Sequence, residues 1–161
     1  MDSTAARKRN IRILLIFFML ALAASGLSAI PLQWEVRLLN QWLGAGSFMQ
    51  PLWPSLAAWI NRVNEGVQTS YGQYPFLAYG TDWLAFGHVA IALAFIGALR
   101  DPFKNVWVVE FGMIACALVI PWAVVFGWLR GIPPFWRLID MSFGIVGIIP
   151  LWYARRLILA R

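Results

Sequence analysis

Four long apolar segments constrain the fold of this chain more than any other feature. They cover residues 13–30, 83–99, 106–129 and 138–154, and almost every charged side chain lies outside them. A helix rises ~1.5 Å per residue, so about 20 apolar residues cross a ~30 Å hydrocarbon core. With 61% hydrophobic and 12% charged residues, the chain is also far from the composition of a soluble domain. The pattern predicts an all-α polytopic membrane protein with four transmembrane helices in a single integral membrane domain, residues 1–161.

The first apolar segment has two interpretations. Four basic residues precede it, and Ala21-Leu22-Ala23 matches the small-x-small pattern at which signal peptides are cleaved. Cleavage there would remove residues 1–23. Because the sequence stays apolar as far as Ile30, we favour an uncleaved first span. In both cases the chain emerges on the far side of the membrane.

The outer connection, residues 31–82, is too long for a plain turn. Apolar residues recur at helical spacing from Leu32 to Leu43, and again from Leu52 to Val63 around two prolines. These stripes predict two short amphipathic helices that lie in the outer interface or cap the bundle. Residues 64–79 contain two glycines, a proline and three tyrosines, which is typical of an irregular loop.

The basic residues predict the orientation in the membrane. Nine lie on the side of the two termini and four on the other: Arg7, Lys8, Arg9, Arg12, Arg100, Lys104, Arg155, Arg156 and Arg161 against Arg37, Arg62, Arg130 and Arg137. Because cytoplasmic loops are enriched in Lys and Arg, we expect a multi-pass protein of a bacterial inner (plasma) membrane with both termini cytoplasmic. The cations cluster at segment ends rather than along a stripe, so they favour membrane lipids as partners and argue against nucleic acid.

Cysteine and histidine are too few for several kinds of site. Cys116 is the only cysteine, which excludes an intramolecular disulfide and a CxxC redox pair. His88 is the only histidine, which excludes haem ligation by two histidines of one chain, and no spacing of ligands indicates zinc. We therefore expect neither a cofactor nor a metal.

Two ionisable side chains lie inside predicted spans, where a charge costs ~2.5–3.5 kcal/mol at the membrane centre. Glu110 lies near the inner end of the third span, within reach of Arg155, Arg156 and Lys104. Of these we expect Arg155 to form an intramembrane ion pair with Glu110. His88 lies near the outer end of the second span. A lone histidine is often a packing residue, so a structural role for His88 is the alternative to a functional one.

The predicted topology gathers further polar residues on the outer side with His88. Asp82 and Asp140 begin predicted helices, where an aspartate caps free backbone amides. Arg130 and Arg137 flank a stiff Gly-Ile-Pro-Pro turn, and Arg137 is three residues from Asp140, a spacing that allows a local pair. Guanidinium groups form bidentate hydrogen bonds with phosphate and carboxylate oxygens.

These residues predict a site for a lipophilic or lipid-like ligand with a polar or anionic head, in the outer half of the bundle. The predicted ligand-binding residues are His88, Arg130, Arg137, Asp140, Tyr71 and Tyr74. Whether the protein is an enzyme stays open. As general acid or proton relay, the candidates are His88, Asp82 and Asp140.

Two other functions fit the same sequence. In a non-catalytic accessory or assembly subunit of a larger membrane complex, the outer polar residues would only anchor and cap helices. A small transporter would require Glu110 to face an aqueous path. The small core of a four-helix bundle predicts a homodimer or association with a larger membrane complex in each case.

Overall fold

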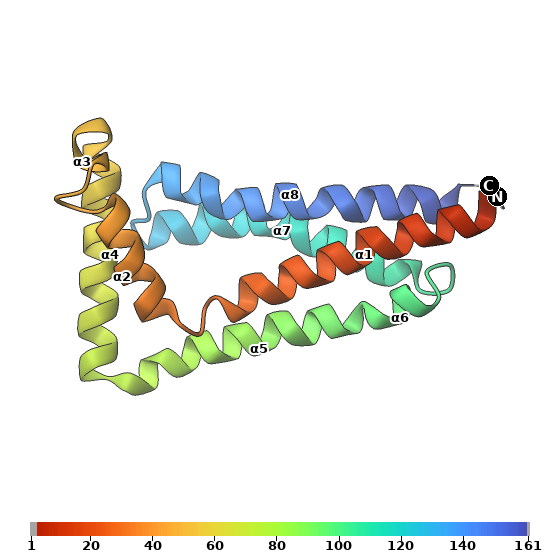
Figure 1. Cartoon of the computed structure of the whole chain (residues 1–161), viewed down its shortest axis with the longest axis horizontal. Coiled ribbons are helices and arrows are strands. Elements are labelled where there is room, and N and C mark those ends of the chain that lie inside the picture. Colours follow the sequence, from red (N-terminus) through yellow and green to blue (C-terminus); the bar gives the residue numbers. More distant parts are fainter. Residues whose placement is uncertain (1–2, 161) are drawn as a thin grey trace. The chain divides into compact units, whose positions relative to one another are not determined.

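The computed structural model describes residues 3–160, which form helices and short connections without a strand (Figure 1). In chain order the elements are α1 (Ser3–Leu27), α2 (Leu32–Leu43), α3 (Met49–Leu52), α4 (Pro54–Gln73), the 3₁₀ helix η1 (Pro75–Ala78), α5 (Tyr79–Ala94), α6 (Ile96–Arg100), α7 (Val106–Leu129) and α8 (Pro134–Leu159). The all-α fold predicted from the sequence is confirmed.

Four helical segments are long and apolar enough to cross a membrane. They are Ala5–Leu27, Pro75–Arg100, Val106–Leu129 and Pro134–Leu159. By the length and apolar composition of these helices, the prediction of a polytopic protein with four transmembrane helices is confirmed. The second segment is not one unbroken helix, because α5 ends one residue before Phe95 and α6 begins one residue after it.

Three of the helices have different ends from the predicted spans. The predicted third span coincides with α7, but α1 starts well before residue 13 and ends before residue 30, α5 starts before residue 83, and α8 extends beyond 138–154 at both ends. Hydropathy marks only the part of a helix in hydrocarbon, whereas backbone hydrogen bonding continues into the polar interface. Arg and Lys are good helix formers, which lets α1 begin among its basic residues.

The prediction of an irregular loop at residues 64–79 is wrong, because α4 continues to Gln73 and η1 and α5 follow at once. A helical glycine costs only ~1 kcal/mol relative to alanine, which tertiary contacts can outweigh. Here Gln68 supplies such contacts: its Nε2 donates to the Gln33 carbonyl oxygen at 2.7 Å, and its Oε1 accepts from Arg37 Nη2 at 3.0 Å. The two amphipathic helices are therefore α2 and α4, the second longer than predicted.

The chain divides into two compact units, with the boundaries inside α1 and α5. In the described chain, unit 1 comprises residues 3–22 and 90–160, and unit 2 comprises residues 23–89. Within unit 2, α2 packs against α4, and the buried residues there include Val36, Leu56 and Ile60.

Unit 1 has its own apolar core, to which α1, the junction of α5 and α6, α7 and α8 all contribute. Its buried residues are Ile11, Leu15, Phe18, Phe95, Ala98, Val108, Val109, Cys116, Leu151, Ala154 and Ile158. The fully buried Phe95 lies at the helix break, with its ring centroid 5.0 Å from that of Phe18. A Cβ atom at Gly112 would lie only 2.6 Å from Phe95 Cζ, so glycine there makes room for the ring.

Helices α7 and α8 run antiparallel, side by side, and make the most extensive helix pair of unit 1 (Figure 1). Their backbones approach closely where Gly144 faces the carbonyl oxygen of Cys116, a position at which a Cβ atom would collide with the backbone. Glycine therefore sets this interhelical distance, as small residues commonly do between membrane helices.

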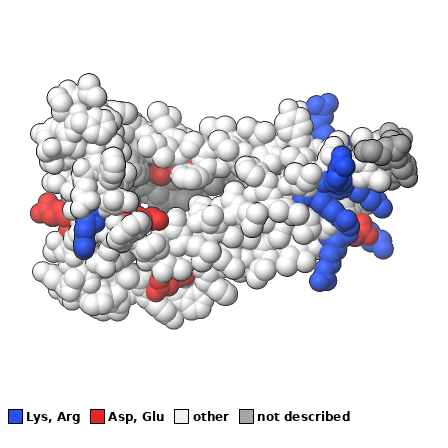
Figure 2. All heavy atoms as spheres, in the orientation of Figure 1, with Lys and Arg blue, Asp and Glu red and all other residues white. Residues whose placement is uncertain are grey.

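Lysine and arginine side chains gather at one end of unit 1 (Figure 2). The ends of α1 and α8 and the connection between α6 and α7 meet there, and Arg7 Nη1 donates to the Ala160 carbonyl oxygen at 2.8 Å. The guanidinium of Arg7 also lies over the Phe103 ring, 5.3 Å from its centroid. Of the nine cations that the sequence places on the side of the termini, Arg161 lies outside the described residues. The Lys and Arg side chains that gather in Figure 2 form one basic end of unit 1.

Candidate functional site

The turn between α7 and α8 places Arg130 at the end of α7 opposite the basic end. Gly131 has a φ of 68°, the left-handed conformation that favours glycine. Gly131 N donates to the Trp128 carbonyl oxygen at 3.2 Å, and Ile132 N donates to that of Gly127 at 2.8 Å. These two bonds form a Schellman motif, which satisfies the last carbonyls of the helix and fixes the direction in which the chain leaves it.

Two prolines then start the next helix. Pro133 is the N-cap residue, with φ −58° and ψ 146°, and Pro134 is the first residue of α8. Proline suits a first helical position because its ring presets φ and the missing N–H would have no partner in the helix. The stiff turn expected from the sequence is therefore present, and it holds Arg130 and Ile132 on a short connection.

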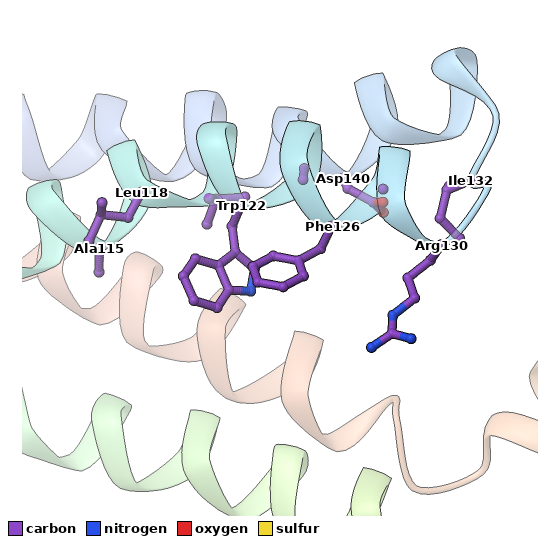
Figure 3. A pocket seen from close by; sticks show the side chains of 10 residues that line it. Ala115, Leu118, Trp122, Phe126, Arg130, Ile132 and Asp140 are labelled. Carbon is purple, nitrogen blue, oxygen red and sulfur yellow. The ribbon is translucent and has the colours of Figure 1, made fainter.

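An apolar groove runs along one face of α7 to this turn (Figure 3). Its volume is about 580 Å³. The lining positions on α7 recur at intervals of three and four residues, so they form a single stripe. The residues that line the groove are Ala115, Leu118, Val119, Trp122, Ala123, Phe126, Gly127, Arg130, Ile132 and Asp140.

Two aromatic rings form the most prominent wall of the groove. The ring centroids of Trp122 and Phe126 are 4.6 Å apart, at an interplanar angle of 43°. Figure 3 shows both rings on the same side of α7 as the side chain of Arg130. The apolar stripe therefore ends at a cation.

Arg130 and Asp140 both line the groove, yet they do not pair with each other. Arg130 is exposed and Asp140 is half-buried, and within residues 3–160 the side chain of neither has a hydrogen bond or an ion pair. Arg130 follows the last residue of α7, whereas Asp140 lies in α8, about 9 Å along the helix axis from Pro134. The end of the groove thus presents two separate opposite charges.

Arg137 lies beside the same end of the groove. Its Cγ and Cδ atoms pack on Gly127, where a Cβ atom would collide with them. Its Nε is buried and has no hydrogen-bond partner in the described part of the chain. With Arg130 and Asp140 it makes a group of two cations and one anion, with a formal charge of +1.

One sequence expectation about these residues is wrong, and one pairing that the sequence allows is not formed. Asp140 does not begin a helix, because α8 already starts at Pro134. The local ion pair that the spacing of Arg137 and Asp140 allows does not form within residues 3–160. The reason is the packing of Arg137 across α7 on Gly127, which directs its side chain toward the neighbouring helix rather than along α8.

His88 lies in unit 2, where it has a packing role. Its Nδ1 lies 2.9 Å from the Leu84 carbonyl oxygen one turn earlier in α5, so the tautomer with a proton on Nδ1 donates to that oxygen. Its Cβ and Cγ atoms face Gly26 of α1 so closely that a Cβ atom there would collide with them. Asp82 is in the first turn of α5, where its charge suits the helix dipole, and six residues place it about 9 Å from His88 along the axis.

The two predicted tyrosine ligands also belong to unit 2. Tyr71 is half-buried near the end of α4, and exposed Tyr74 packs edge-on against Phe76 with a centroid distance of 6.1 Å. No hydrogen bond joins either tyrosine to His88 within residues 3–160. A joint site of His88, Tyr71 and Tyr74 with the charges of unit 1 stays a prediction.

The ion pair expected at the inner end of the third span is present in the structure. Arg155 Nε donates to Glu110 Oε1 at 2.8 Å, and it links α8 to α7. Both side chains are about two-fifths exposed. The pair gives Glu110 a structural role within unit 1.

Sequence reasoning missed the wall of the groove. Hydropathy does not mark Trp122 and Phe126, because α7 is apolar around most of its surface and shows no amphipathic pattern. The available signal was the spacing of four between Trp122, Phe126 and Arg130, which puts two aromatic residues and a cation on one helical face.

No protein-family model, curated protein or solved structure matches this chain. The geometry of the groove is therefore the basis on which a function can be proposed.

Proposed function

We propose that this protein binds a lipid-like molecule, with the apolar chain in the groove of α7 and the polar or anionic head at Arg130. One observation carries the proposal: a continuous apolar stripe on α7 ends at an arginine without an ionic partner among residues 3–160. Binding is proposed without a chemical reaction.

The dimensions of the groove support an acyl chain as its occupant. The stripe from Ala115 to Phe126 is about 16 Å long, close to the depth of one leaflet of a ~30 Å hydrocarbon core. The volume of about 580 Å³ lies within the usual range of ligand pockets, ~300–1,000 Å³. One chain of a lipid, rather than a compact solute, matches a groove of this shape.

The charges at the end of the groove support a polar head. A guanidinium binds phosphate or carboxylate oxygens through parallel hydrogen bonds. Arg130 is exposed, and Arg137 in the first turn of α8 adds a second cation. The distribution of basic residues along the sequence supports cytoplasmic termini in a bacterial inner membrane, which would place this end of the groove in the outer leaflet.

Truncation of Trp122 tests the proposal, because the same helix offers a matched control. Trp122 is 67% exposed and lines the groove, whereas Trp107 is 63% exposed and does not. The protein would be purified in mild detergent, and bound phospholipid measured by native mass spectrometry and phosphate analysis. We expect Trp122→Ala to weaken lipid retention about tenfold, equivalent to ~1.4 kcal/mol, and Trp107→Ala to leave it unchanged.

Two further variants define the extent of the site. Arg130→Gln is expected to reduce retained phospholipid, and His88→Ala shows whether the second unit takes part in binding. Equal lipid retention by wild type, Trp122→Ala and Arg130→Gln would contradict the proposal. It would favour the accessory or assembly subunit instead.

A further inference from the structure

The groove ends at opposite charges, which restricts the head group it can accept. Arg130 and Asp140 line the same cavity, and neither has a hydrogen-bond or ionic partner within residues 3–160. We infer that the head of the bound lipid carries both a phosphate and a primary ammonium group, as in phosphatidylethanolamine. This inference rests on the proposed lipid-binding function and names its ligand class.

The carboxylate of Asp140 argues against a purely anionic head. Asp140 is half-buried beside apolar residues, where a charge is poorly solvated and needs a partner. A second anion in the same cavity would add repulsion to that desolvation. A head that carries a cation removes both problems, because it places a positive group beside the carboxylate.

The kind of cation is restricted as well. A carboxylate in an apolar setting is best satisfied by N–H donors, because charge-assisted hydrogen bonds are about twice as strong as neutral ones. A primary ammonium has three such donors, and a quaternary choline group has none. Asp140 therefore favours an ethanolamine head over a choline head.

The separation of the two side chains fits a head with two charges. Arg130 at the end of α7 and Asp140 in α8 both line the groove and form no ion pair within residues 3–160, so each is available to a different charge of one head group. The phosphate lies toward Arg130, assisted by Arg137 beside Gly127, and the ammonium lies toward Asp140. This arrangement gives each charge of the group a partner of opposite sign.

A lipid competition experiment tests this inference. The full-length protein would be equilibrated with vesicles of equal parts phosphatidylethanolamine, phosphatidylglycerol and phosphatidylcholine, then extracted in detergent, and the retained lipid quantified by mass spectrometry. Wild type is expected to retain phosphatidylethanolamine about tenfold over the other two lipids, which corresponds to ~1.4 kcal/mol. Asp140→Asn keeps the size of the side chain and is expected to abolish the preference while total retained lipid stays nearly constant.

Two controls separate the possible outcomes. Asp101→Asn removes an acid from the basic end, outside the groove, and is expected to leave the lipid ratio unchanged. Arg130→Gln is expected to lower retention of all three lipids. No preference in wild type, a preference for phosphatidylglycerol, or an unchanged ratio in Asp140→Asn would each overturn the inference, while the comparison of Trp122→Ala with Trp107→Ala still decides lipid binding itself.

A second copy of the chain is the other occupant that the groove could accept. Light scattering on the same samples distinguishes it. Loss of a dimer in Trp122→Ala, with retained lipid unchanged, would assign the groove to an interface between copies and overturn both proposals.

Discussion

At the scale of single residues, Glu110 illustrates how a membrane helix accommodates an acid. It lies about 6 Å along α7 from Val106, near the end where the cations gather, and Arg155 of α8 reaches it directly. The pair converts a costly charge into an interhelical contact between α7 and α8. Because both side chains are two-fifths exposed, screening limits its contribution.

A double-mutant cycle on Glu110 and Arg155 measures this contribution. We expect the double variant Glu110→Ala/Arg155→Ala to be destabilised less than the sum of the two single variants, with a coupling of about 0.5–1.5 kcal/mol in thermal unfolding in detergent. The pair of Lys104 and Asp101 is the control, because its 3.8 Å distance and 85% exposed lysine predict a coupling close to zero. Equal coupling in the two cycles would show that the contact of Glu110 with Arg155 has no special weight.

At the scale of elements, the pairing of α7 with α8 depends on glycine rather than on large side chains. A Cβ atom at Gly144 would meet backbone, which cannot move aside. A Cβ atom at Gly147 would instead lie 3.1 Å from the side-chain Sγ atom of Cys116. Membrane helices gain little from burying apolar surface against one another, so close backbone approach is the main source of their attraction. The same pairing creates the groove, because α8 covers one side of α7 and leaves the stripe at Trp122 and Phe126 open.

Alanine at these two glycines therefore has different expected effects. In an open helix, Gly→Ala stabilises by about 0.5–1 kcal/mol. We expect Gly144→Ala to destabilise instead, by about 1–3 kcal/mol, because the added carbon forces α7 and α8 apart. At about 2–4 °C per kcal/mol, the difference from Gly147→Ala is measurable as a lower thermal midpoint in detergent. A Gly144→Ala variant as stable as Gly147→Ala would be incompatible with the close helix approach.

At the scale of the whole molecule, the separation of charge predicts the orientation. The basic end of unit 1 carries the ends of α1 and α8, and Arg7 contacts Ala160 there. Cations resist transfer across the membrane, so this end is expected to stay on the cytoplasmic side.

Reporter fusions at the C-terminus test that orientation. A reporter that fluoresces only in the cytoplasm is expected to be active when fused there, and an enzyme reporter that requires the periplasm is expected to be inactive. The same periplasmic reporter inserted at Gly46, in the connection between α2 and α3, is expected to be active and serves as the control. The reverse result would place the groove end with Arg130 and Asp140 in the inner leaflet.

By itself, the sequence determined the class of the protein, the four spans and the amphipathic character of α2 and α4. These properties depend on residues close together in the chain, because hydropathy and helical periodicity are summed over one helix at a time. The predicted topology added the partner of Glu110, since its depth in the third span matches that of Arg155 in the fourth. It failed at residues 64–79, where contacts of Gln68 with α2 outweigh two glycines, and at Asp140, where α8 starts earlier than its hydropathy indicates.

Only the tertiary structure decided which face of α7 remains open and which charges stand at its end. The hydropathy of α7 is similar on all sides, so hydropathy alone does not distinguish a packed face from an open one. The distinction comes from α8, whose Gly144 and Arg137 pack on Cys116 and Gly127 of α7, residues far away in sequence. This packing leaves Trp122, Phe126 and Arg130 uncovered on one stripe of α7. Which face of α7 is covered depends on how well the surfaces of α7 and α8 fit together.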